Sequence, residues 1–217
     1  MPDKSTSYYE CDRSEMVAFV PETARTILDI GCGAGGYGRT LKASRTAIEV
    51  WGVESNPDIA QIAAKHLDRV VIASFPGPVD VPSNSFDVVQ FNDVLEHMAD
   101  PWEALRQANQ ILKPTGVVVA SIPNVRYLPV LFNLVVRGEW KYTPSGVLDS
   151  THLRFFTRSG IRSLFSDCGY DIERISGIHP LSRWQVQFLS AFFPVVANDM
   201  RYIEFAVVAR PRRGSHA

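Results

Sequence analysis

The fold is decided by Ile27-Leu28-Asp29-Ile30-Gly31-Cys32-Gly33-Ala34-Gly35-Gly36. An apolar run that contains one acid leads into a glycine-rich turn, and the turn opens a helical pattern. Glycines allow a tight turn and let a ligand come close to the backbone. The stretch therefore predicts a strand, a ligand-binding loop and a helix in direct succession.

Outward from this stretch, strand-like runs alternate with helical patterns. The predicted strands cover 25–30, 48–53, 69–73, 86–91 and 116–122, and the predicted helices cover 36–44, 57–66 and 101–112. Asn56-Pro57 and Asp100-Pro101 supply N-caps and first-turn prolines, and Lys113-Pro114-Thr115-Gly116 is expected to turn the chain into the fifth strand. Repeated strand–helix units predict an α/β fold with a parallel sheet and helices on both faces.

The flanking regions complete one predicted domain over residues 1–217. Residues 1–22 are expected to form an N-terminal helical segment, with a helix over 10–20. Residues 124–157 are expected to form an insertion that acts as a lid, with an apolar helix over 125–136. Beyond it, the patterns predict a helix at 158–168 and two last strands at 170–177 and 202–209.

The composition excludes several classes of protein. Hydrophobic residues make up 46% of the 217 residues, charged residues make up 21%, and the formal net charge is -1. This balance gives no field that would attract nucleic acid, and no apolar run approaches the roughly 20 residues of a membrane span. Cys11, Cys32 and Cys168 form no CxxC pair, so we expect reduced thiols in a cytoplasmic protein.

Polar residues follow four of the predicted strands. They are Asp29–Gly36, Glu54, Ser74-Phe75 and Asn92-Asp93. Ligands of such sheets bind beyond the carboxyl ends of the strands, so these four loops are expected to share one site. The null alternative is a tight turn with acids placed by chance.

Asp29 distinguishes between two classes of ligand. Dinucleotide-binding folds and methyltransferase folds both use a glycine loop after a strand. A carboxylate at position 29 would repel a pyrophosphate, whereas it would attract a cationic amino-acid group. Glu54 can accept hydrogen bonds from ribose hydroxyls in either class. The pair favours a nucleoside with a cationic tail.

The chain resembles the class I S-adenosylmethionine-dependent methyltransferases. The resemblance rests on Leu28–Gly35, Gly52-Val53-Glu54, Phe86–Val89, Asn92–His97 and Leu112–Gly116, and it covers about residues 25–122. It implies a Rossmann-like sheet of seven strands, mostly parallel and with an antiparallel last strand, that binds S-adenosylmethionine and transfers its methyl group.

The resemblance also implies roles for individual residues in cofactor binding. The methionine part of the cofactor is expected against Asp29, Gly31, Cys32, Gly33, Asn92 and Asp93, the ribose against Glu54, and the adenine against Ser55, Ser74 and Phe75. Many relatives carry an acid after the third strand that binds the adenine amino group. Here Ser74 stands in that region, which leaves the adenine contact to a hydroxyl or to the backbone.

A second signature covers Leu148-Asp149-Ser150-Thr151-His152-Leu153-Arg154-Phe155-Phe156-Thr157. With Ile122–Arg126 and Gly138–Trp140, it resembles a bacterial branch of these enzymes that is associated with surface-polysaccharide pathways. This resemblance implies a small-molecule or glycan acceptor.

Two histidines are candidates for removing a proton from the acceptor. A histidine near neutral pKa suits this role, and His97 and His152 both lie in the motifs quoted above. The alternatives are a helix-start or supporting role for His97 and a structural hydrogen bond for His152. Since no residues with metal-ligand spacing occur along the chain, no metal is expected.

Four further residues are candidates for binding the acceptor. Trp140 and Tyr142 offer flat apolar surfaces, and Asp149 and Arg154 offer charges. The alternatives are that both aromatic residues anchor the insertion and that Arg154 pairs with Asp149. We expect methyl transfer to oxygen. Transfer to nitrogen or carbon, a cofactor-binding module without transfer activity, and an NAD-dependent oxidoreductase are the alternatives, and the oligomeric state is left open.

Overall fold

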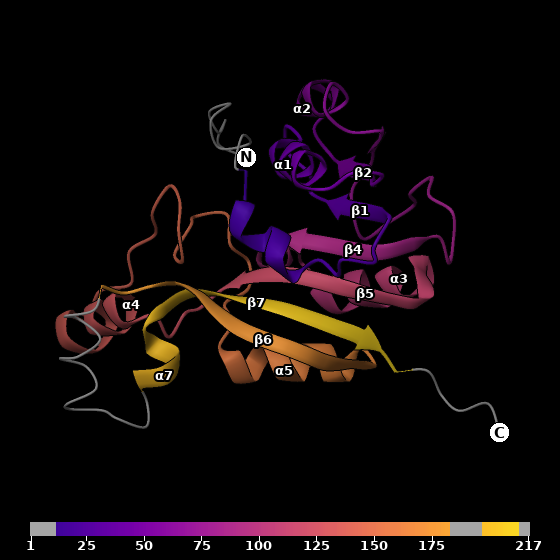
Figure 1. The fold of residues 1–217 in the computed structure, drawn as a ribbon. Coiled ribbons are helices and arrows are strands. Elements are labelled where there is room, and N and C mark those ends of the chain that lie inside the picture. Colours follow the sequence, from indigo (N-terminus) through magenta and orange to yellow (C-terminus); the bar gives the residue numbers. More distant parts are fainter. Residues whose placement is uncertain (1–11, 183–196, 213–217) are drawn as a thin grey trace.

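The computed structural model describes residues 12–182 and 197–212. They contain a seven-stranded sheet in the order β3-β2-β1-β4-β5-β7-β6 (Figure 1). The strands are β1 (Thr26–Ile30), β2 (Glu49–Glu54), β3 (Arg69–Ile72), β4 (Phe86–Asn92), β5 (Leu112–Pro123), β6 (Tyr170–Pro180) and β7 (Tyr202–Pro211). The pairs among β1 to β5 are parallel, and β7 runs antiparallel to both β5 and β6. The predicted Rossmann-like architecture is confirmed.

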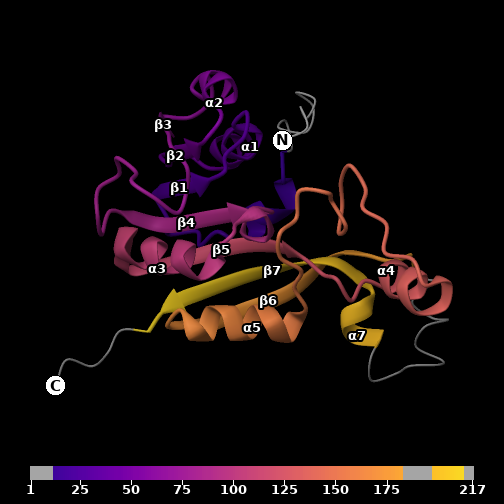
Figure 2. The same ribbon diagram turned by 180° about the vertical axis from the view of Figure 1, so that it is seen from behind.

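Within residues 12–182 and 197–212, four helices of seven or more residues connect the strands (Figures 1 and 2). They are α1 (Gly36–Ser44), α2 (Pro57–Ala63), α3 (Pro101–Ile111) and α5 (Arg158–Asp167). The predicted caps form at Asn56 and Asp100, and Thr157 caps α5 in the same way, because each of the three side chains accepts a hydrogen bond from the backbone at the start of its helix. Each helix therefore begins where the sequence indicates.

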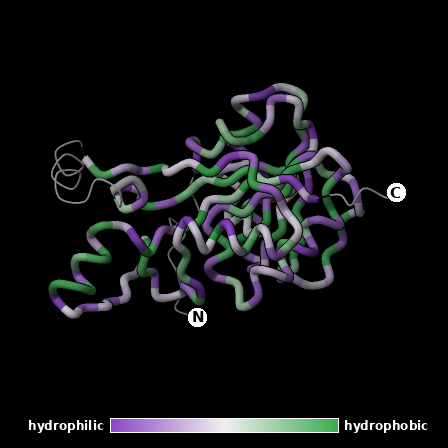
Figure 3. Tube along the Cα trace, turned by 90° about the horizontal axis from the view of Figure 1, so that it is seen from below, coloured by the Kyte–Doolittle hydropathy of each residue, from purple (hydrophilic) through white to green (hydrophobic). Residues whose placement is uncertain are grey.

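Two apolar layers bury the faces of the sheet. One layer joins the strands to α3 and α5 through residues such as Leu105 and Phe165. The other joins them to α1 and to the 3-10 helix η2 (Ser14–Phe19) through residues such as Leu41 and Met16. Apolar residues accordingly gather in the interior of the trace (Figure 3). Coverage of both faces explains the long apolar runs of the central strands.

The structure corrects three details of the predicted elements. Of the helix expected over 10–20, the described part is the 3-10 helix η2 alone, and residues 10 and 11 lie outside the described residues. The helix expected over 125–136 is α4 (Leu128–Phe132), which continues as the π-helix η4 (Asn133–Arg137). The fifth strand, expected to start at 116, begins at Leu112, which pairs with Phe86, and the residues of the expected turn at 113–116 form an irregular stretch before the pair of Val117 with Val88.

The segment between β5 and α5 follows the carboxyl end of β5 and projects from the sheet (Figures 1 and 2). Short bridges join Asn124 to Phe156 and Thr143 to Asp149, so both ends of the segment are held together. The rings of Trp140 and Tyr142 lie 5.2 Å and 6.4 Å from the ring of Phe155. These contacts fold the segment back onto itself.

Candidate functional site

The glycine loop wraps around the end of β2. The N–H groups of Gly31 and Cys32 both donate to the carbonyl of Val53, at 2.8 and 3.2 Å. Gly31 has a φ of +68°, and a Cβ placed on it would lie 2.8 Å from Cγ2 of Val94. Position 31 therefore requires glycine both for its backbone conformation and for its space.

Glu54 fixes the glycine loop through its side-chain carboxylate. Its Oε2 accepts a hydrogen bond from the N–H of Gly33 at 3.1 Å, and its Oε1 accepts one from the N–H of Asn56 at 2.9 Å. The carboxylate thus links the glycine loop to the start of α2. It occupies the position at which sequence analysis expects the ribose acid.

Asp29 lies at the end of β1, beside the same loop. Its side chain is buried, with 2% of the residue exposed. Burial is the main cause that raises the pKa of Asp29 to about 8, and the nearby negative charge of Glu54 adds to it. A cationic group brought next to Asp29 would reverse this effect, because it favours the ionised carboxylate.

A buried polar relay leads from α1 to the end of β4. The hydroxyl of Tyr37 donates to Oε1 of Gln90 at 2.8 Å, and Nε2 of Gln90 donates to Oδ1 of Asn92 at 2.8 Å. Nδ2 of Asn92 is buried and has no hydrogen-bond partner among the described residues. The relay fixes the orientation of the Asn92 side chain, so its Nδ2 group lies at the carboxyl edge of the sheet as a hydrogen-bond donor. A hydrogen-bond acceptor of a ligand could bind it there.

Cys32 is a packed residue of the loop. Its side chain is buried against Gly52, and any Cβ on Gly52 would collide with its sulfur. Burial is the main cause that raises the pKa of the Cys32 thiol, so the thiol stays protonated. This environment is the opposite of the one that activates a nucleophilic cysteine.

The expected adenine side of the site lies at the ends of β2 and β3. Ser55 and Ser74 are exposed, and Phe75 is half-buried with its ring 5.9 Å from the ring of Phe91. The acid expected in many relatives is absent here, as the sequence indicated. Exposed hydroxyl groups beside an aromatic ring are suited to a flat polar base.

Asp93 contacts both β5 and the N-terminal segment. It has a left-handed backbone conformation, with a φ of 51°, and its N–H and carboxylate both bind Ser121. Arg13, in the N-terminal segment, forms ion pairs with Asp93 and with Glu204 of β7. The N-terminal segment is thereby attached to the carboxyl edge of the sheet.

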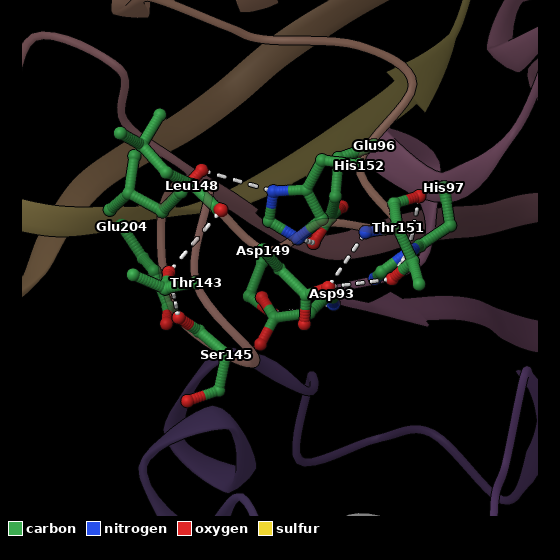
Figure 4. A network of polar contacts seen from close by, with 12 residues as sticks. Asp93, Glu96, His97, Thr143, Ser145, Leu148, Asp149, Thr151, His152 and Glu204 are labelled. Atoms are coloured by element: carbon green, nitrogen blue, oxygen red, sulfur yellow. Dashed lines mark hydrogen bonds and ion pairs between the residues drawn. The ribbon is translucent and has the colours of Figure 1, made fainter. Parts of the chain in front are cut away.

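His97 and His152 lie together beyond β4 (Figure 4). His97 belongs to the 3-10 helix η3 (Leu95–His97), and the two rings are 4.7 Å apart and nearly perpendicular. Nδ1 of His152 lies 3.0 Å from the carbonyl of Val147, and its Nε2 lies 3.9 Å from Oε1 of Glu96. The fold thus brings the two histidines that the sequence proposed as bases to one place.

The loop that carries His152 is bound to η3 through the backbone. The N–H groups of Leu153 and Arg154 both donate to the carbonyl of Glu96, at 2.8 and 3.0 Å. The guanidinium of Arg154 donates to the carbonyl of Ala99 at 2.6 Å and lies over the ring of Trp102. The contacts of Arg154 therefore fasten this loop to the chain around Ala99 and Trp102.

Asp149 organises the start of the same loop. Its Oδ1 accepts hydrogen bonds from the N–H and from the hydroxyl of Thr151, both at 2.8 Å. Thr151 in turn contacts Nδ1 of His97 through its hydroxyl and through its carbonyl, at 3.1 and 3.2 Å. Asp149 is buried and holds His97 indirectly, while Trp140 and Tyr142 are exposed.

Sequence reasoning assigned no function to Glu96. Glu96 is part of the motif at Asn92–His97, but the sequence gives its carboxylate no function. No metal was expected, because no residues along the chain have the spacing of metal ligands. The fold places ligand atoms of Glu96, His97 and His152 within 4.8 Å of one another. The available signal was an acid directly followed by a histidine in the junction between β4 and α3, and this pair becomes informative only when the distant His152 joins it.

The comparisons with known proteins identify the family. A family model described as a methyltransferase domain matches residues 7–175, and the chain therefore belongs to the methyltransferase-domain family. A ubiquinone biosynthesis O-methyltransferase of Cereibacter sphaeroides is 29% identical over 182 residues, which are 80% of this chain and 68% of the relative. The ubiquinone biosynthesis O-methyltransferase of Azorhizobium caulinodans is 28% identical over 161 residues, which are 70% of this chain and 61% of the relative.

Solved structures share the fold. An S-adenosylmethionine-dependent methyltransferase from Archaeoglobus fulgidus matches with a TM-score of 0.68, 18% identity and 94% coverage of both chains. The cyclase SpnF matches with a TM-score of 0.61 and 20% identity, over 93% of this chain and 80% of that one. The protein is a class I methyltransferase with S-adenosylmethionine as its cofactor. Two groups suit that cofactor, namely the buried Asp29 and Nδ2 of Asn92, which has no hydrogen-bond partner among the described residues.

Among residues 12–182 and 197–212, no helix has the length and apolar character needed to cross a bilayer.

Proposed function

We propose that this methyltransferase transfers the methyl group to a hydroxyl oxygen of a small molecule or glycan. The observation that carries the proposal is the contact between His97 and His152 beyond β4, next to the strands whose ends form the cofactor site. The names of the relatives, which are O-methyltransferases, support oxygen as the acceptor atom.

The proposed cofactor position follows from the polar groups at the strand ends. Asp29 binds the ammonium group, and the backbone of Gly31, Cys32 and Gly33 surrounds the methionine part. Glu54 binds the ribose hydroxyls with the lone pairs that its two backbone donors leave available. Nδ2 of Asn92 and the backbone of Asp93 bind the carboxylate end, and Ser55, Ser74 and Phe75 border the adenine.

The proposed chemistry is an in-line displacement at the methyl carbon. The acceptor oxygen attacks the carbon as the carbon–sulfur bond breaks, so alignment of the two reactants contributes much of the rate. The acceptor must also lose its proton. If Nδ1 of His152 donates to the carbonyl of Val147, its Nε2 carries the lone pair that can accept a proton or bind a cation. His97 stands beside it as the second candidate.

The acceptor site is proposed to lie between these histidines and the insertion over 124–157, which serves as a lid on a single domain. Trp140 and Tyr142 would present their exposed rings to a sugar or to another flat acceptor, with Asp149 and Arg154 at the border. A link to surface-polysaccharide pathways is proposed on the motif at 148–157 alone. The free thiols of Cys32 and Cys168 support a reducing, cytoplasmic location.

A cofactor-binding module without methyl transfer is the competing function. It is favoured by one observation, namely that the shared fold includes the cyclase SpnF. Fold alone does not determine the reaction, so transfer of a labelled methyl group must be measured directly.

The test combines cofactor binding with transfer. We expect S-adenosylhomocysteine to raise the melting temperature and NAD to leave it unchanged. Asp29→Ala should reduce the shift, and His152→Ala should preserve it while abolishing labelled methyl transfer to a panel of hydroxylated metabolites and glycans. Transfer to amines in place of hydroxyls, or a stable His152→Ala enzyme with full activity, would contradict the proposal.

A further inference from the structure

We propose that Glu96, His97 and His152 bind one divalent transition-metal cation. The three side chains come from two separate segments, η3 and the loop at 148–157, and one ligand atom from each lies within 4.8 Å of the others. Figure 4 shows them at the centre of a network of polar contacts. None of these residues is part of the cofactor site at Asp29 and Glu54.

The environment of Glu96 is the first argument. Only 1% of the residue is exposed, and neither carboxylate oxygen has a hydrogen-bond partner among the described residues. An ionised carboxylate buried without partners costs several kcal/mol, and such groups are normally paired or bound to a metal. A cation between Glu96 and the histidines would supply the missing partner.

The distances are the second argument. Oε1 of Glu96 lies 3.9 Å from Nε2 of His152, which is longer than a hydrogen bond. Ligands about 2.0–2.2 Å from a shared cation stand roughly 3–4.4 Å from each other, depending on the coordination angle. The separation of 3.9 Å lies within this range, and the limit of 4.8 Å for all three ligand atoms would need only a small inward shift to close around one ion.

The supporting contacts of both histidines are the third argument. Metal-ligating histidines usually donate their other ring N–H to a carbonyl or carboxylate. Nδ1 of His152 contacts the carbonyl of Val147, and Nδ1 of His97 contacts the carbonyl and hydroxyl of Thr151, which Asp149 holds. When both Nδ1 atoms donate, both Nε2 atoms carry the lone pairs that a metal needs.

The donor set indicates the class of cation. Two imidazoles and one carboxylate suit Zn²⁺, Fe²⁺, Co²⁺ or Mn²⁺, whereas Mg²⁺ and Ca²⁺ prefer sites built of oxygen atoms. Three protein ligands also leave at least one coordination position for another molecule, as in catalytic zinc sites. His97 is only half-buried, so protein does not enclose the cluster completely.

The role of the cation rests on the proposed function, whereas the existence of the site does not. A hydroxyl of the acceptor that occupies the open position would lose its proton to solvent at a lower pH than it does in water. Its oxygen then forms the bond to the methyl carbon while the carbon–sulfur pair moves to sulfur. The products are a methyl ether and S-adenosylhomocysteine. The acceptor class is accordingly a hydroxyl compound that can coordinate a metal.

Binding of Co²⁺ to the metal-free full-length protein tests the site. We expect one Co²⁺ per chain with visible d–d absorption bands, displacement by Zn²⁺, and a higher melting temperature. Glu96→Gln and His152→Asn should each weaken Co²⁺ binding by 100-fold or more, and Asp149→Asn should weaken it by about 10–100-fold through the support of His97. His179→Gln is the matched control, because His179 pairs with Glu15 outside the cluster and should leave binding unchanged.

Two results would overturn the proposal. One is Co²⁺ binding that is equally tight in folded His152→Asn protein and in the wild type, with folding checked by S-adenosylhomocysteine binding. The other is an absence of stoichiometric Co²⁺ or Zn²⁺ binding to wild-type protein that binds S-adenosylhomocysteine normally. Full methyl transfer after removal of bound metal would reject the catalytic role alone, whereas stoichiometric metal binding without any transfer would reject the proposed function and preserve the site.

Discussion

The N–H of Gly33 donates a hydrogen bond to the carboxylate of Glu54 at 3.1 Å, so the acid at the end of β2 holds the loop at the end of β1. Glu54 also accepts a hydrogen bond from Asn56 at the start of α2. One side chain therefore fixes the shape of the loop before any ligand arrives. Such preorganisation lowers the cost of binding.

Removal of this carboxylate should weaken cofactor binding. Glu54→Ala removes the proposed ribose acceptor and the hydrogen bond to the loop. Hydrogen bonds to charged groups contribute about 1.5–3 kcal/mol, which corresponds to a roughly 10- to 150-fold rise in the dissociation constant of S-adenosylhomocysteine. Isothermal titration calorimetry measures this change. Glu49→Ala, on the same strand but exposed, is the control and should bind as the wild type does.

Cofactor binding should depend on pH through Asp29. Its pKa is raised from 3.8 to about 8 in the ligand-free protein, so at pH 6 the carboxyl group is mostly protonated. A ligand ammonium favours the ionised form, and binding therefore releases a proton. The affinity for S-adenosylhomocysteine should rise by up to about tenfold per pH unit between pH 6 and 7.5. An Asp29→Asn protein with the same slope would contradict this assignment.

The same residue should lower stability at high pH. Because the folded-state pKa of Asp29 lies above its ordinary value, the folded protein binds a proton that the unfolded chain has released. Its contribution is fully favourable below about pH 3.8 and is lost as the pH rises through about 8. Urea denaturation of ligand-free protein at pH 6 and pH 8.5 should show wild type losing stability relative to Asp29→Asn.

Gly31 should be intolerant of a side chain for two separable reasons. Gly31→Ala places a Cβ 2.8 Å from Val94 and forces alanine into a positive φ of +68°. Left-handed backbone costs a non-glycine residue about 1–2 kcal/mol, and the collision adds to that cost. Addition of Val94→Ala should relieve the collision only. The double variant should therefore be less stable than Val94→Ala by about 1–2 kcal/mol in chemical denaturation. Equal stabilities would show that the backbone conformation carries no cost.

The buried relay should be sensitive to loss of one hydroxyl. Tyr37→Phe leaves Oε1 of Gln90 without its donor in a buried setting, which costs about 1–3 kcal/mol. The free energy of unfolding measures this loss, and Tyr142→Phe on the exposed insertion is the control with a change below about 0.5 kcal/mol. A neutral Tyr37→Phe would mean that water replaces the hydroxyl.

The sheet could be predicted because its signals are local. Apolar runs such as 48–53 end at residues that interrupt them, and Asn56 and Asp100 cap helices from within their own sequence. The start of β5 could not be read in this way. Pro114 and Gly116 are typical turn residues and do lie in an irregular stretch, but Leu112 before them already pairs with Phe86 on a neighbouring strand, and that long-range contact leaves no local signal.

The residues expected at the strand ends lie where the topology predicts, because parallel strands place their carboxyl ends at one edge. The contact between His97 and His152 follows from no such rule. It depends on two backbone hydrogen bonds to the carbonyl of Glu96, which leave no pattern in the sequence. The cluster with Glu96 therefore emerges only from the three-dimensional arrangement.

These two hydrogen bonds have a consequence for the diversity of such enzymes. Leu153 and Arg154 are fastened to Glu96 by main-chain atoms, which every residue except proline can supply. The stretch between β5 and Val147, ahead of Asp149 and His152, can therefore change in length and composition without losing this attachment. Grafting that stretch from one homologue onto another is thus a practical route to new acceptor preferences, with the cofactor half of the molecule left untouched.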